Sequence, residues 1–90
     1  MNELNEDPAA RASKYIATLI TTFKKSKPKT VDTGVRAVDI LRVTDAIERY
    51  LQDAQHYLEQ GRTATALTSV AYAEGLLDAL FFLELASKAI

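Results

Sequence analysis

Arg49 and His56 are two side chains whose types and spacing could support catalysis in this 90-residue sequence. They are seven residues apart, which is two turns of a helix, so both would lie on one side of it. Asp45 and Asp53 would lie on the same face. A histidine there can assist proton transfer, and an arginine can hold a phosphate group. The simpler interpretation is a solvated face with an Asp45–Arg49 ion pair, and we prefer it.

The spacing of Arg49 and His56 resembles the Arg-x(4–6)-His element of the HEPN superfamily of helical ribonucleases and nucleotide-binding modules. This resemblance implies a nucleotide- or RNA-handling helical module. His56 would then assist proton transfer, and Arg49 would hold phosphate. We keep this function as the alternative to a non-enzymatic role.

Glu74 and Asp78 form an acidic pair four residues apart, and Asp53 could face them across a helical hairpin. Paired carboxylates can bind a divalent cation or share a proton. The chain has one histidine and no cysteine, so we expect neither a metal site nor a cofactor. We expect Glu74 to bond instead to a tyrosine or arginine of a neighbouring helix, such as Tyr50 or Arg49.

A third group consists of lysines that follow one another closely in the sequence, namely Lys24, Lys25, Lys27 and Lys29. Cations at the C-terminal end of a helix complement its dipole. The functional alternative is contact with phosphate or RNA. No aromatic residue is interleaved with the lysines, and the net charge of the chain is -1, so we predict a solvated loop.

Three helices must position these groups, and the sequence predicts one all-α domain over residues 1–90. Asp7 and Pro8 are typical of a helix start, and Gly61 suits the end of a helix. We expect helices at about 8–25, 33–60 and 64–88, a loop at 26–32 and frayed residues 1–6. The fold is then an antiparallel three-helix bundle with a long helical hairpin that turns at Gly61.

Apolar residues at helical spacing predict the core faces of the hairpin. The second helix would bury Ile40, Val43, Ile47, Leu51, Ala54 and Leu58, and the third would bury Ala66, Val70, Ala73, Leu76, Leu77, Leu80 and Leu83. A rotated stripe of Val31, Val35, Val38 and Leu41 indicates that the second helix bends or that its first turns pack against a different neighbour.

The opposite side of the third helix is unusually small and apolar. It carries the interface candidates Ala71, Gly75, Ala79, Phe82 and Ala86. In an isolated three-helix bundle this side would point to water, so we predict that it binds a second copy or another helical protein. The expected function is a non-enzymatic interaction or scaffold domain that forms a homo-oligomer.

Composition supports a cytoplasmic protein without a membrane segment. The N-terminal MNELNEDP is acidic and polar, unlike a secretory signal, and no apolar run approaches the ~20 residues that span a bilayer.

Specific residues of the hairpin resemble a family of small archaeal proteins catalogued as domain of unknown function 357. They are Tyr50, Asp53, Ala54, Gly61 and the string YAEGLLDAL at residues 72–80. The resemblance covers roughly residues 35–82 and implies a single helical bundle with no established activity.

A weaker likeness links the hairpin to a single tetratricopeptide-type repeat, through Ala54, Tyr57, Ala66, Val70 and Ala73. Asp78 stands where such a repeat has its closing proline.

Overall fold

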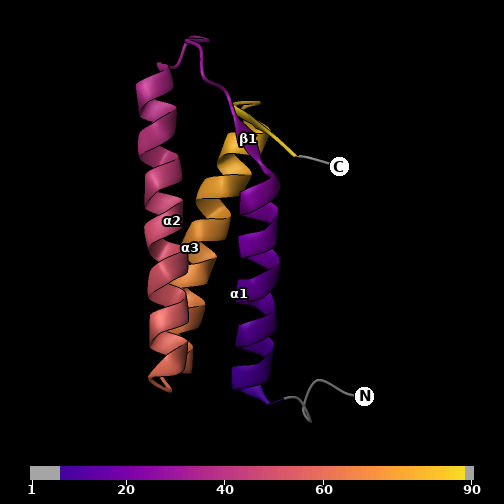
Figure 1. The fold of residues 1–90 in the computed structure, drawn as a ribbon, viewed down its shortest axis with the longest axis vertical. Helices are drawn as coiled ribbons and strands as arrows, with labels where there is room; N and C mark the ends of the chain where they lie inside the picture. Colours follow the sequence, from indigo (N-terminus) through magenta and orange to yellow (C-terminus); the bar gives the residue numbers. More distant parts are fainter. Residues whose placement is uncertain (1–6, 89–90) are drawn as a thin grey trace.

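The computed structural model describes residues 7–88, and three α-helices account for most of them. They are α1 (Pro8–Lys25), α2 (Ala37–Glu59) and α3 (Thr63–Phe82). Figure 1 shows that α1 and α3 run in one direction and α2 in the other, with α3 behind the other two. The molecule measures 46 × 26 × 15 Å. The predicted all-α bundle is confirmed, whereas the predicted fraying of residues 1–6 falls outside the described residues.

The first helix begins as the sequence predicts. Oδ1 of Asp7 accepts a hydrogen bond from the backbone N–H of Ala9 at 3.1 Å, and Pro8 occupies the first helical position. Its missing N–H costs nothing there. The helix ends at Lys25, after which the hydroxyl of Ser26 donates to the carbonyl of Phe23 at 2.6 Å.

The second helix begins at Ala37, four residues later than the predicted position 33. Gly34 has a φ of +90°, which a helix excludes. The N-cap residue, Arg36, makes no side-chain cap bond, but Oδ1 of Asp32 accepts a hydrogen bond from the first helical N–H, that of Ala37, at 2.8 Å. This turn therefore lengthens the predicted loop at 26–32 as far as Arg36.

Gly61 closes the hairpin between α2 and α3 with a φ of +77°. Its N–H donates to the carbonyl of Leu58 at 3.0 Å, and the N–H of Arg62 donates to the carbonyl of Tyr57 at 2.8 Å. These two bonds satisfy carbonyls that the end of α2 would otherwise leave open.

The third helix ends at Phe82, not at residue 88. Glu84 adopts a φ of +57°, and the N–H of Leu85 folds back to the carbonyl of Leu80 at 2.8 Å. This reversal buries the side chain of Leu85. The chain then forms β2 (Ala86–Ser87), which pairs antiparallel with β1 (Lys27–Pro28) inside the predicted loop. Burial of Leu85 and this pairing replace the last predicted turns of helix.

The core lies where the three helices meet, and α2 and α3 make its most extensive contacts. Ala54, Ala66 and Ala73 are fully buried, because small side chains let the two helices of the hairpin approach closely. One predicted core residue is wrong: Leu83 is 66% exposed because it follows the last turn of α3. The Val31, Val35, Val38 and Leu41 side chains are also exposed, so no neighbour within the described chain covers that stripe.

Candidate functional site

The Arg49 and His56 side chains lie on the solvent side of α2 and are both exposed. The His56 ring contacts the side-chain amide of Gln60, with 3.2 Å between the two Nε2 atoms. Arg49 borders an open groove that Ala46, Tyr50 and Asp53 also line. Asp45 and Arg49 form no ion pair in the described structure.

Glu74 does bond to a tyrosine of a neighbouring helix, but that tyrosine is Tyr15 of α1 rather than Tyr50. The hydroxyl of Tyr15 donates to Oε1 of Glu74 at 2.6 Å. Burial, the hydrogen bond to Glu74, and the negative charges of Glu74 and Asp78 together raise the pKa of Tyr15 to about 12. The carboxylate of Glu74 thus has a structural partner.

Asp78 lies near Glu74 beside a small cavity between α1 and α3. Tyr15 and Lys88 also line this cavity, whose volume is about 120 Å³. Asp53 lines the groove beside Arg49 on α2, so it does not join this cluster. Among residues 7–88, no three His, Asp or Glu side chains are arranged to hold a metal ion.

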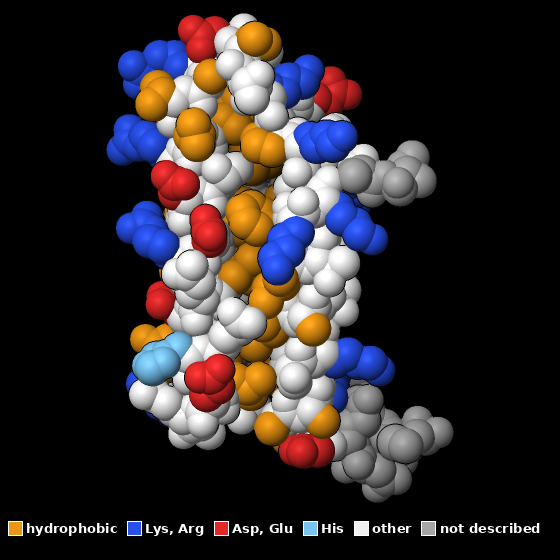
Figure 2. All heavy atoms as spheres, in the orientation of Figure 1, with side chains coloured by type: hydrophobic (Ala, Val, Ile, Leu, Met, Phe, Trp, Pro, Cys, Tyr) orange, Lys and Arg blue, Asp and Glu red, His pale blue; other side chains and the backbone are white. Residues whose placement is uncertain are grey.

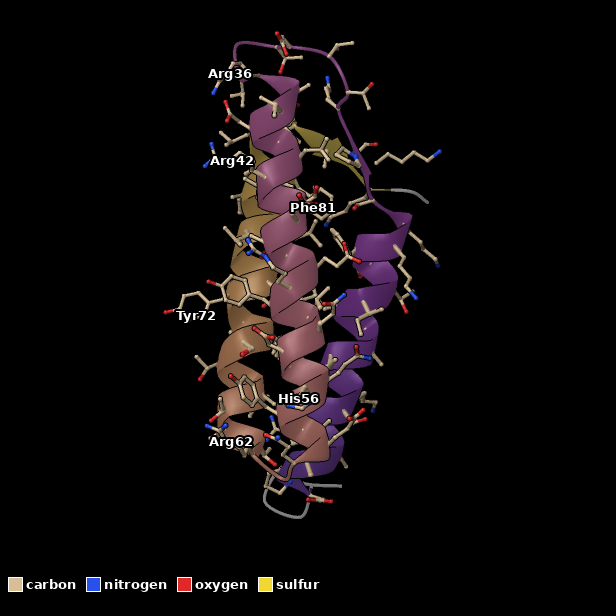
Figure 3. All side chains as sticks on the ribbon, turned by 60° about the vertical axis from the view of Figure 1, so that its left-hand side comes forward. Arg36, Arg42, His56, Arg62, Tyr72 and Phe81 are labelled. Carbon is tan, nitrogen blue, oxygen red and sulfur yellow. The ribbon has the colours of Figure 1, made fainter. Side chains whose placement is uncertain are left out.

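Tyr50 stacks instead on Tyr72 of α3, with ring centroids 5.5 Å apart and planes 21° from parallel. Figure 3 shows Tyr72 projecting outward from α3, consistent with its 60% exposure. Nearer the turn, the guanidinium of Arg62 lies 4.7 Å from the centre of the Tyr57 ring. Sequence reasoning missed the Tyr50–Tyr72 pair, although both tyrosines stand eleven residues from Gly61.

The four predicted phosphate-contact lysines are exposed at one end of the molecule, where α1 ends. Lys24 and Lys25 close α1, Lys27 is in β1, and the N–H of Lys29 donates to the carbonyl of Leu85 at 2.8 Å. The strand pairing therefore fixes the backbone of part of this segment, while the lysine side chains stay in solvent. Figure 2 shows that the facing surface between α1 and α2 is mainly an apolar seam with charged borders.

The outer face of α3 is a predicted site that stays open to solvent. Ala71, Gly75 and Ala79 are exposed, and the side chain of Phe82 is 84% exposed. Ala86 does not belong to this face: it is 6% exposed and pairs with Pro28, because the chain has left the helix. We define the α3 outer face as Ala64, Thr68, Ala71, Gly75, Ala79 and Phe82, which are all exposed and uncharged.

Comparison with known protein families identifies the family of this chain. Residues 14–86 match the family described as protein of unknown function, DUF357. No curated protein and no solved structure matched the chain. Within the described residues, no helix is long and apolar enough to cross a membrane. The matched residues include α2, α3 and most of α1, and so extend beyond the predicted stretch of 35–82. The chain therefore belongs to the DUF357 family.

Proposed function

We propose that this protein is a non-enzymatic helical interaction domain that forms a homodimer through the α3 outer face. The observation that carries the proposal is the 84% exposure of Phe82 at the end of a face without charged residues. A helix that is apolar all round is normally buried on every side. Only Glu74 and Asp78 are charged among the residues of α3, and both line the cavity beside α1.

The expected gain comes from burial of apolar surface. Each Å² of apolar area removed from water returns roughly 25 cal/mol. Ala71, Gly75 and Ala79 let a second helix approach closely, so Phe82 can be covered as well. A domain of 90 residues has a small core of its own and benefits from such a contact.

Analytical ultracentrifugation of wild type beside Ala79→Glu and Ala17→Glu tests this proposal. Both alanines are exposed and helical, but Ala17 lies on α1, away from the α3 outer face. We expect wild type and Ala17→Glu to sediment as dimers and Ala79→Glu as a monomer. A monomeric wild type at high micromolar concentration would overturn the proposal, and so would equal effects of the two glutamates.

The alternative remains a nucleotide- or RNA-handling module. The position of Arg49 in a groove beside the stacked Tyr50 favours it, since a base can stack on an aromatic ring. An RNA-cleavage assay with His56→Ala as control tests catalysis. Salt-dependent RNA binding without cleavage, lost in Lys27→Ala/Lys29→Ala, would point to the lysine segment. The cytoplasmic location, the archaeal source and the tetratricopeptide likeness stay predictions.

A further inference from the structure

Gly75 has no role in its own chain that requires a glycine. It lies in the middle of α3, and a Cβ built on it would meet no atom within 4 Å. Glycine within a helix is less favourable than alanine by about 1 kcal/mol. A glycine is useful where another backbone approaches closely. In the proposed dimer, Gly75 is therefore the natural crossing point of two α3 helices.

Side-chain size changes along the α3 outer face on either side of Gly75. Thr68 and Ala71 lie toward the start of α3, and Ala79 and Phe82 lie toward its end. An antiparallel pair that crosses at Gly75 puts Ala79 against the partner's Ala71, and Phe82 against the partner's Thr68. The large ring then meets a smaller residue. The two helix dipoles point in opposite directions, which is the favourable arrangement for neighbouring helices. A parallel pair would place Phe82 against the partner's Phe82.

Two contacts show which residues of α1 and α2 lie level with each turn of α3. The Tyr15–Glu74 hydrogen bond fixes the position of α1 along the axis of α3, and these two helices are parallel. The Tyr50–Tyr72 stack fixes the position of α2 along the same axis, and α2 is antiparallel to α3. Each residue along a helix advances the level by about 1.5 Å. The charged residues that flank the α3 outer face can therefore be placed relative to Gly75.

On the α2 side, Arg42 precedes Tyr50 by eight residues and so lies level with Leu80 of α3. Asp53 follows Tyr50 by three residues and lies level with Ser69. Both side chains are exposed, and Figure 3 shows Arg42 projecting on the side of α2 nearer α3. The two levels are nearly equidistant from Gly75, so a two-fold axis there brings Arg42 opposite the partner's Asp53.

On the α1 side, Lys14 is adjacent to Tyr15 and lies level with Ala73, two residues before Gly75. Asp78 lies three residues beyond Gly75, so the same axis brings Lys14 opposite the partner's Asp78. Lys14 and Asp78 are both exposed. The pairing thus matches opposite charges on both flanks, and each pair occurs twice by symmetry.

Resting on the dimer proposed above, we infer that the second copy lies antiparallel across α3 about a two-fold axis near Gly75. Arg42 then faces the partner's Asp53, and Lys14 faces the partner's Asp78. A standard interface covers about 800 Å² on each partner, compared with a total accessible surface of 6299 Å² for one chain. The flanks of α1 and α2 extend the narrow α3 outer face toward that area.

Cysteine cross-linking tests the direction of the two helices, because the chain has no native cysteine. A disulfide needs Cα atoms about 4.4–6.8 Å apart. We expect a mixture of Ala71→Cys and Ala79→Cys to form a covalent dimer on mild oxidation, while neither variant cross-links alone. A parallel pair would instead cross-link each single variant with itself.

Charge exchange tests the flanks. Arg42→Asp and Asp53→Arg should each raise the dissociation constant of the dimer about tenfold, since each places like charges together. The double variant restores opposite charges and should return to within about threefold of wild type. Glu59→Arg is the control, because Glu59 is exposed and lies on the side of α2 that borders α1; it should leave the constant unchanged.

The two proposals fail in different ways. A wild-type monomer in the ultracentrifuge overturns the dimer itself. A wild-type dimer in which the single Ala71→Cys and Ala79→Cys variants cross-link leaves the dimer standing and overturns the antiparallel arrangement. The antiparallel arrangement is also overturned if the double charge variant has a dissociation constant as high as those of the single variants.

Discussion

The hydroxyl of Tyr15 on α1 donates a 2.6 Å hydrogen bond to Oε1 of Glu74 on α3, across 59 positions of sequence. Hydrogen bonds to an ionised acceptor are short and stronger than neutral ones. This bond fixes the level of α1 against α3 and occupies one of the two carboxylates that the sequence offers as a metal or proton site. Its physical consequences can be measured separately from any function.

Tyr15→Phe should lower the free energy of unfolding by about 1–3 kcal/mol, because the partly buried Glu74 loses its donor. Urea denaturation followed by circular dichroism measures the change. Tyr72→Phe is the matched control: the hydroxyl of Tyr72 makes no hydrogen bond in the described structure, and its side chain is 60% exposed. Equal stability of Tyr15→Phe and wild type would contradict the structural role of the bond.

Alkaline pH should remove the contribution of Tyr15. Its pKa is raised from 10.0 to about 12, first by burial and then by the bond and charges of Glu74 and Asp78. The unfolded chain releases this proton near pH 10, whereas the folded chain holds it to a higher pH. The stabilisation is therefore complete below pH 10 and is lost between pH 10 and 12.

The stability difference between wild type and Tyr15→Phe should accordingly stay constant from pH 7 to 9 and shrink above pH 10. Ultraviolet titration of tyrosinate provides a second measurement: the ionisation step of Tyr15 at about pH 12 should be missing in the variant. A difference that grows with alkaline pH would reverse the sign of the argument.

Asp32→Ala should destabilise the protein by about 1 kcal/mol, because the first helical N–H of α2, that of Ala37, loses its acceptor. Asp32→Asn keeps a side-chain oxygen and should lose less. Thermal unfolding of the three proteins at one concentration gives the comparison. Identical midpoints for wild type, Asp32→Ala and Asp32→Asn would show that the bond from Asp32 contributes nothing to stability.

Gly75→Ala should have opposite effects on folding and on association. The single chain should gain about 0.5–1 kcal/mol of stability, because alanine favours the helix and open space surrounds the added Cβ. The dimer should weaken, because the two backbones can no longer approach as closely. Urea unfolding at low concentration and sedimentation at high concentration separate the two effects. A variant that gains stability with undiminished association would place Gly75 outside the interface.

Sequence spacing predicted the buried faces of α2 and α3 well, including Ile47, Leu51 and Ala73, because helical periodicity determines which residues share a side. Periodicity does not determine which side of α3 the first helix occupies, so the sequence predicted Tyr50 or Arg49, and not Tyr15, as the partner of Glu74. Nor could it predict β1 and β2, since two residues form no pattern. The early end of α3 depends on the burial of Leu85, a tertiary contact that overrides helix propensity.

Contacts within the α2–α3 hairpin join residues that are closer in sequence than the residues that join α1 to α3. Most contacts of the hairpin form across one tight turn, whereas α1 joins α3 through residues far apart in the chain. Amide exchange should therefore be slowest in α2 and α3 and faster as one unit in α1. Such partial opening would release α1 and leave Gly75 and Phe82 on an intact hairpin. The proposed recognition surface would then belong to the most persistent part of the molecule.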